Sequence, residues 1–327
     1  MFAAIDHLIT FDPGGRNSRA LYAAARGSPE CDDRPLVEQA AEQLLDAISP
    51  GSTVAIATGF PITAVGRPET DGPLGAVVLG RALATLGARP VFLVEPALEP
   101  AIDALAAELG LDSPTIEPVE PSGSSEPAAS ETPGLGLLDR DDPAAVVAVE
   151  KPGRTADGTY RNMAGEDVSG SVGSVDGLFD EAADRGIPTV AVGDGGNEIG
   201  MGSIQEAVER EIDHGGTIAC VQPADALVVA GVSNWGAYGI VAGLSVLSGQ
   251  ELLHTGRIER SLLDVCVSAG CVDGVTARPT PSVDGIPGDR HAHVVDLLFG
   301  GVTAFHARDG VVDSEAARHS ETDTTEK

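Results

Sequence analysis

The chain alternates apolar runs of strand length with helical stretches, and this alternation limits its possible folds more than any other feature. The predicted strands are Thr53–Ala57, Pro90–Val94, Ala144–Val149, Pro188–Val192 and Ala226–Ala230. The predicted helices are Leu36–Ile48, Leu74–Leu86, Ala101–Leu109, Val175–Ala183, Ile199–Ile212 and Ala237–Leu247. Buried strands separated by helices are typical of an α/β fold with a mainly parallel sheet flanked by helices. Ligands of such folds bind beyond the carboxyl ends of the strands, where this chain places polar, glycine-rich segments.

Two segments have a composition that opposes folding. Residues 117–134 read EPVEPSGSSEPAASETPG, and residues 313–327 read DSEAARHSETDTTEK. Segments rich in Pro, Ser and Glu bury too little apolar surface to compensate for the entropy of ordering. We therefore expect a single α/β domain over residues 1–312, with a disordered acidic insert at 117–134 and a disordered tail at 313–327.

Charge excludes several classes of partner. The 327 residues include 20 basic and 50 acidic side chains, a formal net charge of -30, and the only lysines are Lys151 and Lys327. Binding to nucleic acid or to an anionic membrane depends on basic side chains, so neither is expected. Dense carboxylates with almost no lysine are typical of proteins from salt-accumulating organisms such as halophilic archaea, where salt screens the repulsion between acidic groups.

The cysteines and the N-terminal residues favour a cytoplasmic location. Cys31, Cys220, Cys266 and Cys271 form no CxxC pair and have no zinc-site spacing, so reduced thiols are expected. The first residues, MFAAIDHLITFDPGG, lack the basic start and apolar run of a signal peptide. No segment has the roughly 20 apolar residues of a membrane span. A homo-oligomer is compatible with these features.

The most informative loop is GDGGNEIGMG, residues 193–202, which follows the strand at 188–192. A dinucleotide-binding GxGxxG loop would require glycine at Glu198, and Asp194 and Glu198 would both repel a pyrophosphate, so no nucleotide is expected. Carboxylate and amide oxygens suit a hard cation such as Mn²⁺ or Mg²⁺, or an ammonium group, which makes Asp194, Asn197 and Glu198 candidate ligands. The alternative is a tight turn in which Glu198 stabilises a helix N-terminus.

Two further loops follow predicted strands. TGFPIT begins with Thr58 and leads to ETDGPLGA, where Asp71 is either a helix cap or a site carboxylate. The segment EKPGRTADGTYRNM, residues 150–163, contains Arg154, Asp157 and Arg161. Cations are scarce in this chain, and the fork geometry of arginine suits an anionic ligand. A salt-bridge cluster within the protein is the alternative for this second loop.

The remaining candidates are Asn234, in SNWGAYG after the last predicted strand, and Asp273, in CVDGVT. The histidines are scattered, and no Ser-His-Asp or G-x-S-x-G pattern occurs, which disfavours acyl-enzyme chemistry. The pair His291 and His293 is more typical of satisfied or exposed side chains than of metal ligands.

Taken together, these segments resemble the D-glutamate cyclase family, in its C-terminal-domain type, formerly a domain of unknown function. The similarity lies in TGFPIT with ETDGPLGA, EKPGRTADGTYRNMAGEDVS, GDGGNEIGMG, SNWGAYG and CVDGVT, which run in order over nearly the whole chain. The resemblance implies an α/β lyase that closes D-glutamate to 5-oxo-D-proline with loss of water, acting on a small acidic amino acid.

This reaction suggests roles for the candidate residues. Its amine must lose a proton before it attacks, and the carboxylate under attack must lose charge to a proton or a metal. The catalytic candidates are Asp194, Glu198 and Asp157. The candidates for substrate binding are Arg154, Arg161, Thr58, Asn234, Gly195 and Gly196. The candidates for binding Mn²⁺ or Mg²⁺ are Asp71, Asp194, Asn197, Glu198 and Asp273.

Two other functions fit the same residues. Acidic loops at the carboxyl ends of a parallel sheet also gather divalent cations in phosphatases and related hydrolases that act on small anionic substrates. Such an enzyme would need three or more carboxylates within reach of one cation. A binding protein for acidic amino acids would show saturable binding without any product.

Overall fold

A computed structural model describes residues 1–28, 33–121 and 135–322. Within these residues, six strands form one sheet whose neighbours all pair in parallel. The strands of this sheet are β1 (Thr53–Thr58), β4 (Arg89–Val94), β5 (Thr115–Pro118), β6 (Ala145–Val149), β7 (Thr189–Gly193) and β8 (Ala226–Val229). Two short hairpins pair β2 (Pro61–Ile62) with β3 (Arg67–Pro68), and β9 (Ser282–Val283) with β10 (Ile286–Pro287).

The strand order is β5-β4-β1-β6-β7-β8. The chain builds outward from β1 on one side, then returns to place β6 beside β1 and builds outward on the other. The order therefore reverses between β1 and β6, which makes this pair the topological switch point of the sheet. Right-handed crossovers place the connecting helices on opposite faces on either side of this point. The resulting crevice at the carboxyl ends of β1 and β6 is where ligands of open α/β sheets bind.

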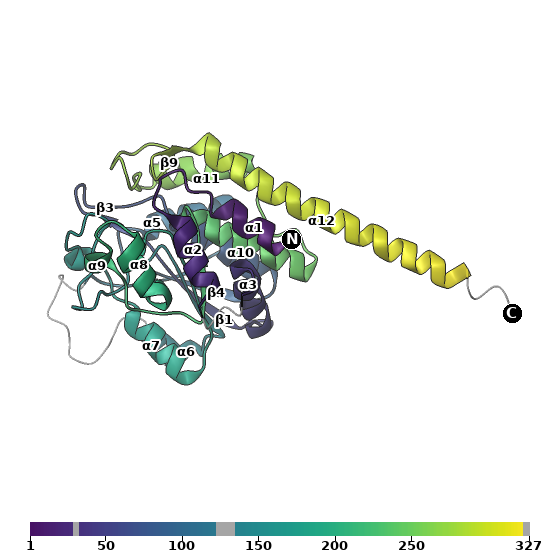
Figure 1. The fold of residues 1–327 in the computed structure, drawn as a ribbon, viewed down its shortest axis with the longest axis horizontal. Coiled ribbons are helices and arrows are strands. Elements are labelled where there is room, and N and C mark those ends of the chain that lie inside the picture. Colours follow the sequence, from purple (N-terminus) through teal and green to yellow (C-terminus); the bar gives the residue numbers. More distant parts are fainter. Residues whose placement is uncertain (29–32, 122–134, 323–327) are drawn as a thin grey trace.

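The helices form a layered shell around the sheet (Figure 1). They are α1 (Phe2–Ile9), α2 (Ser18–Arg26), α3 (Leu36–Ala47), α4 (Pro73–Thr85), α5 (Glu99–Leu109), α6 (Leu135–Asp141), α7 (Asp176–Arg185), α8 (Gln205–Glu211), α9 (Gly215–Ile218), α10 (Ser233–Ser248), α11 (Gly256–Ser268) and α12 (Gly288–Thr322). Short 3₁₀ turns occur at Ser169–Ser171 and Gly202–Ile204. Helix α10 packs against α3 and α4, and α11 and α12 cover this layer, with α12 projecting beyond the rest of the molecule (Figure 1).

Small residues allow α4 and α10 to approach closely. A side chain at Gly75 would place its Cβ 2.9 Å from the Cβ of Ala237 and 3.0 Å from the Cα of Asn234, so only glycine fits there. The core consists mainly of Val, Leu, Ile and Ala, and every residue of β1 is buried. This close contact holds the N-termini of both helices beside the switch point, where their loops carry polar residues.

The predicted fold class is confirmed, and the five predicted strands match β1, β4, β6, β7 and β8 within a residue or two. The sheet has one further strand, β5, whose residues Glu117 and Pro118 fall inside the predicted disordered insert. Val119, which follows it, is also buried. The ordered edge strand thus extends into the segment that composition alone indicated to be disordered. The remainder of that prediction, residues 122–134, lies outside the described residues.

Two other predictions differ from the structure. The predicted helix Ile199–Ile212 begins only at Gln205, because Gly200 adopts φ +96° and packs its backbone against Ala191, which prevents a helical turn there. The predicted disordered tail is helical in the structure as far as Thr322, in keeping with the Glu and Ala residues of this segment. Residues 323–327 lie outside the described part of the chain. None of the helices in the described ranges is both long and apolar enough to span a membrane.

Candidate active site

A cavity of about 360 Å³ lies at the carboxyl ends of the strands, beside the switch point. The described residues that line it are Arg16, Phe60, Pro61, Ile62, Thr63, Ala64, Glu69, Glu150, Asn162, Met163, Ala164, Glu166, Asp194, Asn197, Glu198, Gly274, Val275, Ala277 and Asp284. Its size falls at the lower end of the roughly 300–1,000 Å³ of small-molecule pockets. Segments from the N-terminus, from the loops after β1, β6 and β7, and from the β9–β10 hairpin therefore meet in one site.

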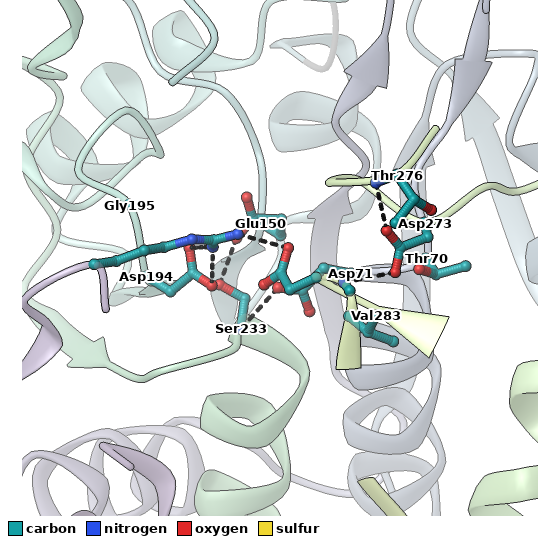
Figure 2. Close-up of polar contacts among 12 residues, drawn as sticks. Thr70, Asp71, Glu150, Asp194, Gly195, Ser233, Asp273, Thr276 and Val283 are labelled. Atoms are coloured by element: carbon teal, nitrogen blue, oxygen red, sulfur yellow. Dashed lines mark hydrogen bonds and ion pairs between the residues drawn. The ribbon is translucent and has the colours of Figure 1, made fainter. Parts of the chain in front are cut away.

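Three buried carboxylates meet beside this cavity. Asp71, Glu150 and Asp194 each offer an oxygen, and these oxygens lie within 4.8 Å of one another (Figure 2). Asp71 precedes α4, Glu150 follows β6 and Asp194 follows β7. We call these residues the carboxylate triad. Hard oxygen donors at this spacing suit a divalent cation such as Mg²⁺ or Mn²⁺.

Asp71 is held in place by the N-terminus of α10. Its carboxylate accepts hydrogen bonds from the backbone N–H groups of Ser233, at 2.9 Å, and Asn234, at 2.8 Å. In return, the side-chain oxygen of Asn234 accepts hydrogen bonds from Gly72 N, at 3.0 Å, and Gly75 N, at 2.7 Å, at the start of α4. Each helix is thus capped by a residue from the other. Asp71 is both a cap and a site carboxylate, although the helix that it caps is α10 rather than the expected α4.

Glu150 has a strained backbone. Its φ is +46°, a left-handed conformation that non-glycine residues rarely adopt, and its carboxylate accepts a hydrogen bond from the Ser233 hydroxyl. Such a conformation costs about 1–3 kcal/mol and is concentrated at functional sites. Asp284, across the cavity, has φ +54° for a different reason, because it and Gly285 form the two-residue turn between β9 and β10. Glu150 is therefore presented by a backbone conformation that packing alone does not favour.

Arg16 supplies the positive charge of the cavity. One guanidinium nitrogen lies 2.7 Å from both carboxylate oxygens of Asp194, and another lies 2.7 Å from Asp284. The loop before α2 is held by Asp12, which accepts hydrogen bonds from the backbone N–H groups of Arg16 and Ser18. The neighbouring carboxylate of Asp194 raises the pKa of Arg16 well above its usual value.

The carboxylates outnumber this single cation, and their proton affinities reflect the imbalance. Burial and neighbouring carboxylates raise the pKa of Asp71 to about 7. Burial likewise raises the pKa values of Glu69, Glu150 and Asp194 well above their usual range, with further contributions from nearby acids. Groups with pKa values shifted toward neutrality can accept and donate protons in the working pH range.

The GDGGNEIG loop is organised by its own glutamate. The carboxylate of Glu198 accepts hydrogen bonds from Gly195 N, at 2.8 Å, and Gly196 N, at 2.7 Å, so these amides, predicted to bind substrate, already have an acceptor. The side-chain amide of Asn197 donates to the backbone oxygen of Arg161 at 2.8 Å. Asp194, Asn197 and Glu198 all line the cavity, as expected of site residues, but only Asp194 belongs to the carboxylate triad.

The EKPGRTADGTYRNM segment contributes residues other than those predicted. Arg154 pairs with Asp180 at 2.8 Å, and Arg161 pairs with Asp157 at 3.3 Å. The side chain of Asp157 is 61% exposed, and hydrogen bonds from Thr155 and Thr159 lower its pKa. None of Arg154, Asp157 and Arg161 is among the described residues that line the cavity, so the structure does not bring them to the triad.

The last predicted residues lie near the site without lining the cavity. Thr58 is fully buried at the end of β1, and its hydroxyl has no hydrogen-bond partner among the described residues. Asn234 is also buried, as the cap of α4. Asp273 shapes the loop that bounds the cavity, because its carboxylate accepts hydrogen bonds from Ser282, Thr276 N and Gly285 N.

Sequence reasoning did not select Arg16, Glu69, Glu150 or Asp284 as site residues. Glu150 carries a usable signal, because it directly follows a buried strand next to the strand that precedes Asp194. Arg16 carries a weaker signal, a lone cation beside a glycine turn. Glu69 and Asp284 lie in turns that become part of the site only when distant segments meet.

The fold is that of a doubly wound α/β protein, and the cavity at its switch point is the candidate small-molecule site. The chain belongs to the D-glutamate cyclase-like, C-terminal family, whose model matches residues 5–299. It is 32% identical over 335 residues to human "D-glutamate cyclase, mitochondrial", with 92% of this chain and 52% of the human protein covered. The chain thus spans about half the length of that relative.

Proposed function

We propose that this chain is an enzyme that closes D-glutamate to 5-oxo-D-proline with loss of one water. Membership of the family and similarity to a human D-glutamate cyclase support this activity. The observation that carries the proposal is the cavity itself, where one guanidinium and several carboxylates with raised pKa values surround a space suited to a small amino acid. The proposed substrate is therefore a small acidic amino acid, as the sequence predicts.

The residues of the cavity can supply the proton transfers. The α-ammonium of glutamate must lose a proton before its nitrogen attacks the carbon of the side-chain carboxyl group. The new C–N bond forms, the nitrogen loses a second proton, and a C–O bond breaks as the departing oxygen, which takes up two protons in all, leaves as water. We assign Asp194, whose ionised form Arg16 favours, to accept an ammonium proton, together with the ionised form of Glu150. We assign Glu69, whose raised pKa favours its protonated form, to donate one to the departing oxygen.

A divalent cation in the carboxylate triad would fit this chemistry. Asp71, Glu150 and Asp194 would hold it, and Asp284 has a buried carboxylate oxygen without a hydrogen-bond partner in the described structure, so the site retains acceptor capacity. When bound, Mn²⁺ or Mg²⁺ would withdraw charge from the carboxyl group under attack. Glutamate carries two carboxylates and one ammonium, and an acidic cavity repels such an anion unless a cation or protons compensate. We therefore expect activity to depend on a divalent cation.

The test is chiral chromatography with mass detection. The protein is incubated at high salt with D- or L-glutamate, with and without Mn²⁺ or Mg²⁺. We expect a product lighter by one water from the D-isomer alone, formed only with the cation. Absence of product from D-glutamate under every condition would contradict the proposed activity.

A second candidate is a divalent-metal-dependent phosphatase or related hydrolase of small anions. The carboxylate triad favours it, because such enzymes need a cluster of this kind. An aryl phosphate incubated in parallel distinguishes the two candidates. Its hydrolysis in the absence of any cyclised product would favour the hydrolase.

A further inference from the structure

Arg16 differs from the other arginines of the chain in where its charge lies. Among the described residues that line the cavity, it supplies the one guanidinium, and no lysine joins it. It is also part of the wall and not of the interior, since its side chain is 21% exposed, whereas those of Asp194 and Asp284 are 1% and 7% exposed. The guanidinium is thus held by two buried carboxylates while the side chain keeps access to the cavity.

The pairing of Arg16 with Asp194 conflicts with cation binding. One guanidinium nitrogen of Arg16 engages both oxygens of Asp194 at 2.7 Å, and Asp194 is also a member of the triad. A divalent cation held by Asp71, Glu150 and Asp194 would take one of these two oxygens and repel the guanidinium. Cation binding would therefore weaken the contact between Arg16 and Asp194 and free donors of Arg16 for another acceptor.

A carboxylate of the substrate is the natural replacement for Asp194. The guanidinium has a planar fork of N–H donors that matches a carboxylate with two parallel hydrogen bonds. Its second contact, to Asp284 at 2.7 Å, and the hydrogen bonds of Asp12 to the loop backbone would keep the side chain at the wall during the exchange.

We propose that Arg16 binds a carboxylate group of the substrate, and that it couples this binding to the binding of a divalent cation. In this coupling, Arg16 exchanges its contact with Asp194 for a contact with the substrate carboxylate. This inference rests on the proposed function for the identity of the substrate. By linkage, a ligand carboxylate then tightens cation binding by the same factor as the cation tightens ligand binding. Couplings of this kind amount to about 5- to 150-fold.

The experiment measures Mn²⁺ affinity by the electron paramagnetic resonance signal of free Mn²⁺, using the full chain at high salt. The probe is glutarate, a dicarboxylate that lacks the amine and cannot cyclise. In the wild type, we expect glutarate to tighten Mn²⁺ binding by at least about 5-fold. In Arg16→Ala, we expect tighter Mn²⁺ binding without glutarate, because the competing guanidinium is gone, and no effect of glutarate. Arg16→Lys keeps the charge without the fork and should retain only part of the coupling.

Arg185→Ala is the matched control. This variant removes an arginine that pairs with Asp139 and Glu181 at the surface of α7, and it should behave as the wild type in both titrations. Circular dichroism verifies that each variant is folded, and Arg16→Lys tests the coupling with the local charge unchanged. A wild-type protein without coupling would overturn the proposal, as would an Arg16→Ala variant with unchanged Mn²⁺ affinity and an unchanged glutarate effect.

Cyclisation of D-glutamate, assayed in parallel, separates this proposal from the proposed function. A wild type that cyclises D-glutamate while Arg16→Ala keeps its KM and its coupling would overturn only the role of Arg16. A wild type that shows the coupling, lost in Arg16→Ala, but forms no 5-oxo-D-proline would support the carboxylate site and overturn the cyclase activity.

Discussion

Helix α10 contributes to two buried polar regions that differ in how their carboxylates are compensated. Its N-terminus holds Asp71 beside the carboxylate triad. One turn further along, Tyr238 joins Glu259 and His254 in an interhelical cluster between α10 and α11. Both regions bury carboxylates at similar depth within the same layer of helices. We interpret Glu259 as a carboxylate that stabilises the fold, and the carboxylates of the triad as groups that take part in a reaction.

In the interhelical cluster, the single carboxylate has donors for both oxygens. The Tyr238 hydroxyl lies 3.2 Å and 3.0 Å from the two oxygens of Glu259, and His254 Nε2 lies 2.7 Å from the second. Burial and Glu259 raise the pKa of Tyr238 well above its usual value, which keeps its hydroxyl a donor. Buried polar groups in native structures are generally paired in this way.

The carboxylates at the cavity also have hydrogen-bond donors, and they differ from Glu259 in the balance of charge. Glu69, Asp71, Glu150 and Asp194 all have raised pKa values, and they share Arg16 as the cation of the cavity. A cluster of like charges destabilises the protein unless a ligand compensates for it, so such a cluster indicates a functional site. An unbalanced cluster thus identifies a functional site more reliably than burial or acidity alone.

The largest expected effect follows from Glu150→Gln, which removes one triad carboxylate and preserves its shape. We expect cyclisation to fall by about 10²- to 10⁴-fold, the usual contribution of a positioned acid or base. We also expect Mn²⁺ affinity to fall by at least about 10-fold, since even changes outside the ligand shell cost about 10- to 100-fold. Turnover by chiral chromatography and Mn²⁺ titration measure these effects.

The thermal stability of Glu150→Gln, unlike its activity, should not fall. Burial and neighbouring acids raise the pKa of Glu150, so a neutral amide removes the cost of burying and repelling a charge there, and the Tm without cation should equal or exceed that of the wild type. If Glu150→Gln lost stability as well as activity, Glu150 would stabilise the fold as Glu259 does in the interhelical cluster, and the two regions would not differ in this respect.

The matched change in the other region is Glu259→Gln, which should have a smaller and purely structural effect. The amide nitrogen introduced would face Tyr238 or His254, both of which now donate to Glu259, and leave a buried donor unsatisfied. We expect the free energy of unfolding to fall by about 1–3 kcal/mol. Thermal unfolding followed by circular dichroism measures it. Cyclisation well below the Tm should remain near the wild-type rate, and a loss as large as that of Glu150→Gln would show that the cluster takes part in the reaction.

The fold could largely be predicted from the sequence because buried parallel strands are continuous apolar runs. The edge strand β5 could not, since its residues are partly exposed and lead into a Pro- and Ser-rich segment. The helix start at residue 199 was wrong because a glycine with positive φ, at Gly200, leaves no mark in hydrophobic periodicity.

The site could be predicted only in part, for a related reason. Four of the predicted residues follow strands or precede helices, namely Asp71, Asp194, Asn197 and Glu198. Their positions relative to the strands correctly indicated the edge of the sheet at which they lie. Arg16 reaches Asp194 across 178 positions of sequence, and no local pattern encodes that approach. Strand-end reasoning also selected the arginines nearest a strand, Arg154 and Arg161, which the structure pairs with acids outside the cavity lining. Their predicted role in substrate binding stays a prediction.

A further expected effect is on the pH dependence of the free energy of unfolding, to which two buried groups beside helix α10 contribute in opposite directions. In the cavity, the folded state raises the pKa of Asp71 from 3.8 to about 7 and binds protons that the unfolded chain has released. The free energy of unfolding should therefore fall as the pH rises from about 4 to 7. The free energy of unfolding changes by about 1.4 kcal/mol for each unit by which the pKa of a group in the folded state exceeds its pKa in the unfolded chain.

Over part of the same pH range, a histidine beside α10 changes the free energy of unfolding in the opposite direction. His291 accepts a hydrogen bond from Trp235 at 2.9 Å, and burial lowers its pKa below 6.5. The unfolded chain then binds a proton that the folded state does not, so the free energy of unfolding falls as the pH drops below about 6.5. Thermal unfolding from pH 4 to 8 should show a Tm that falls as the pH rises to about 7, less steeply below pH 6.5, where His291 opposes Asp71. Saturating Mn²⁺ or Glu150→Gln should reduce this fall, and Glu259→Gln should leave it in place. A slope below pH 7 that neither Mn²⁺ nor Glu150→Gln changes would mean that the charges of the carboxylates are already compensated without a cation.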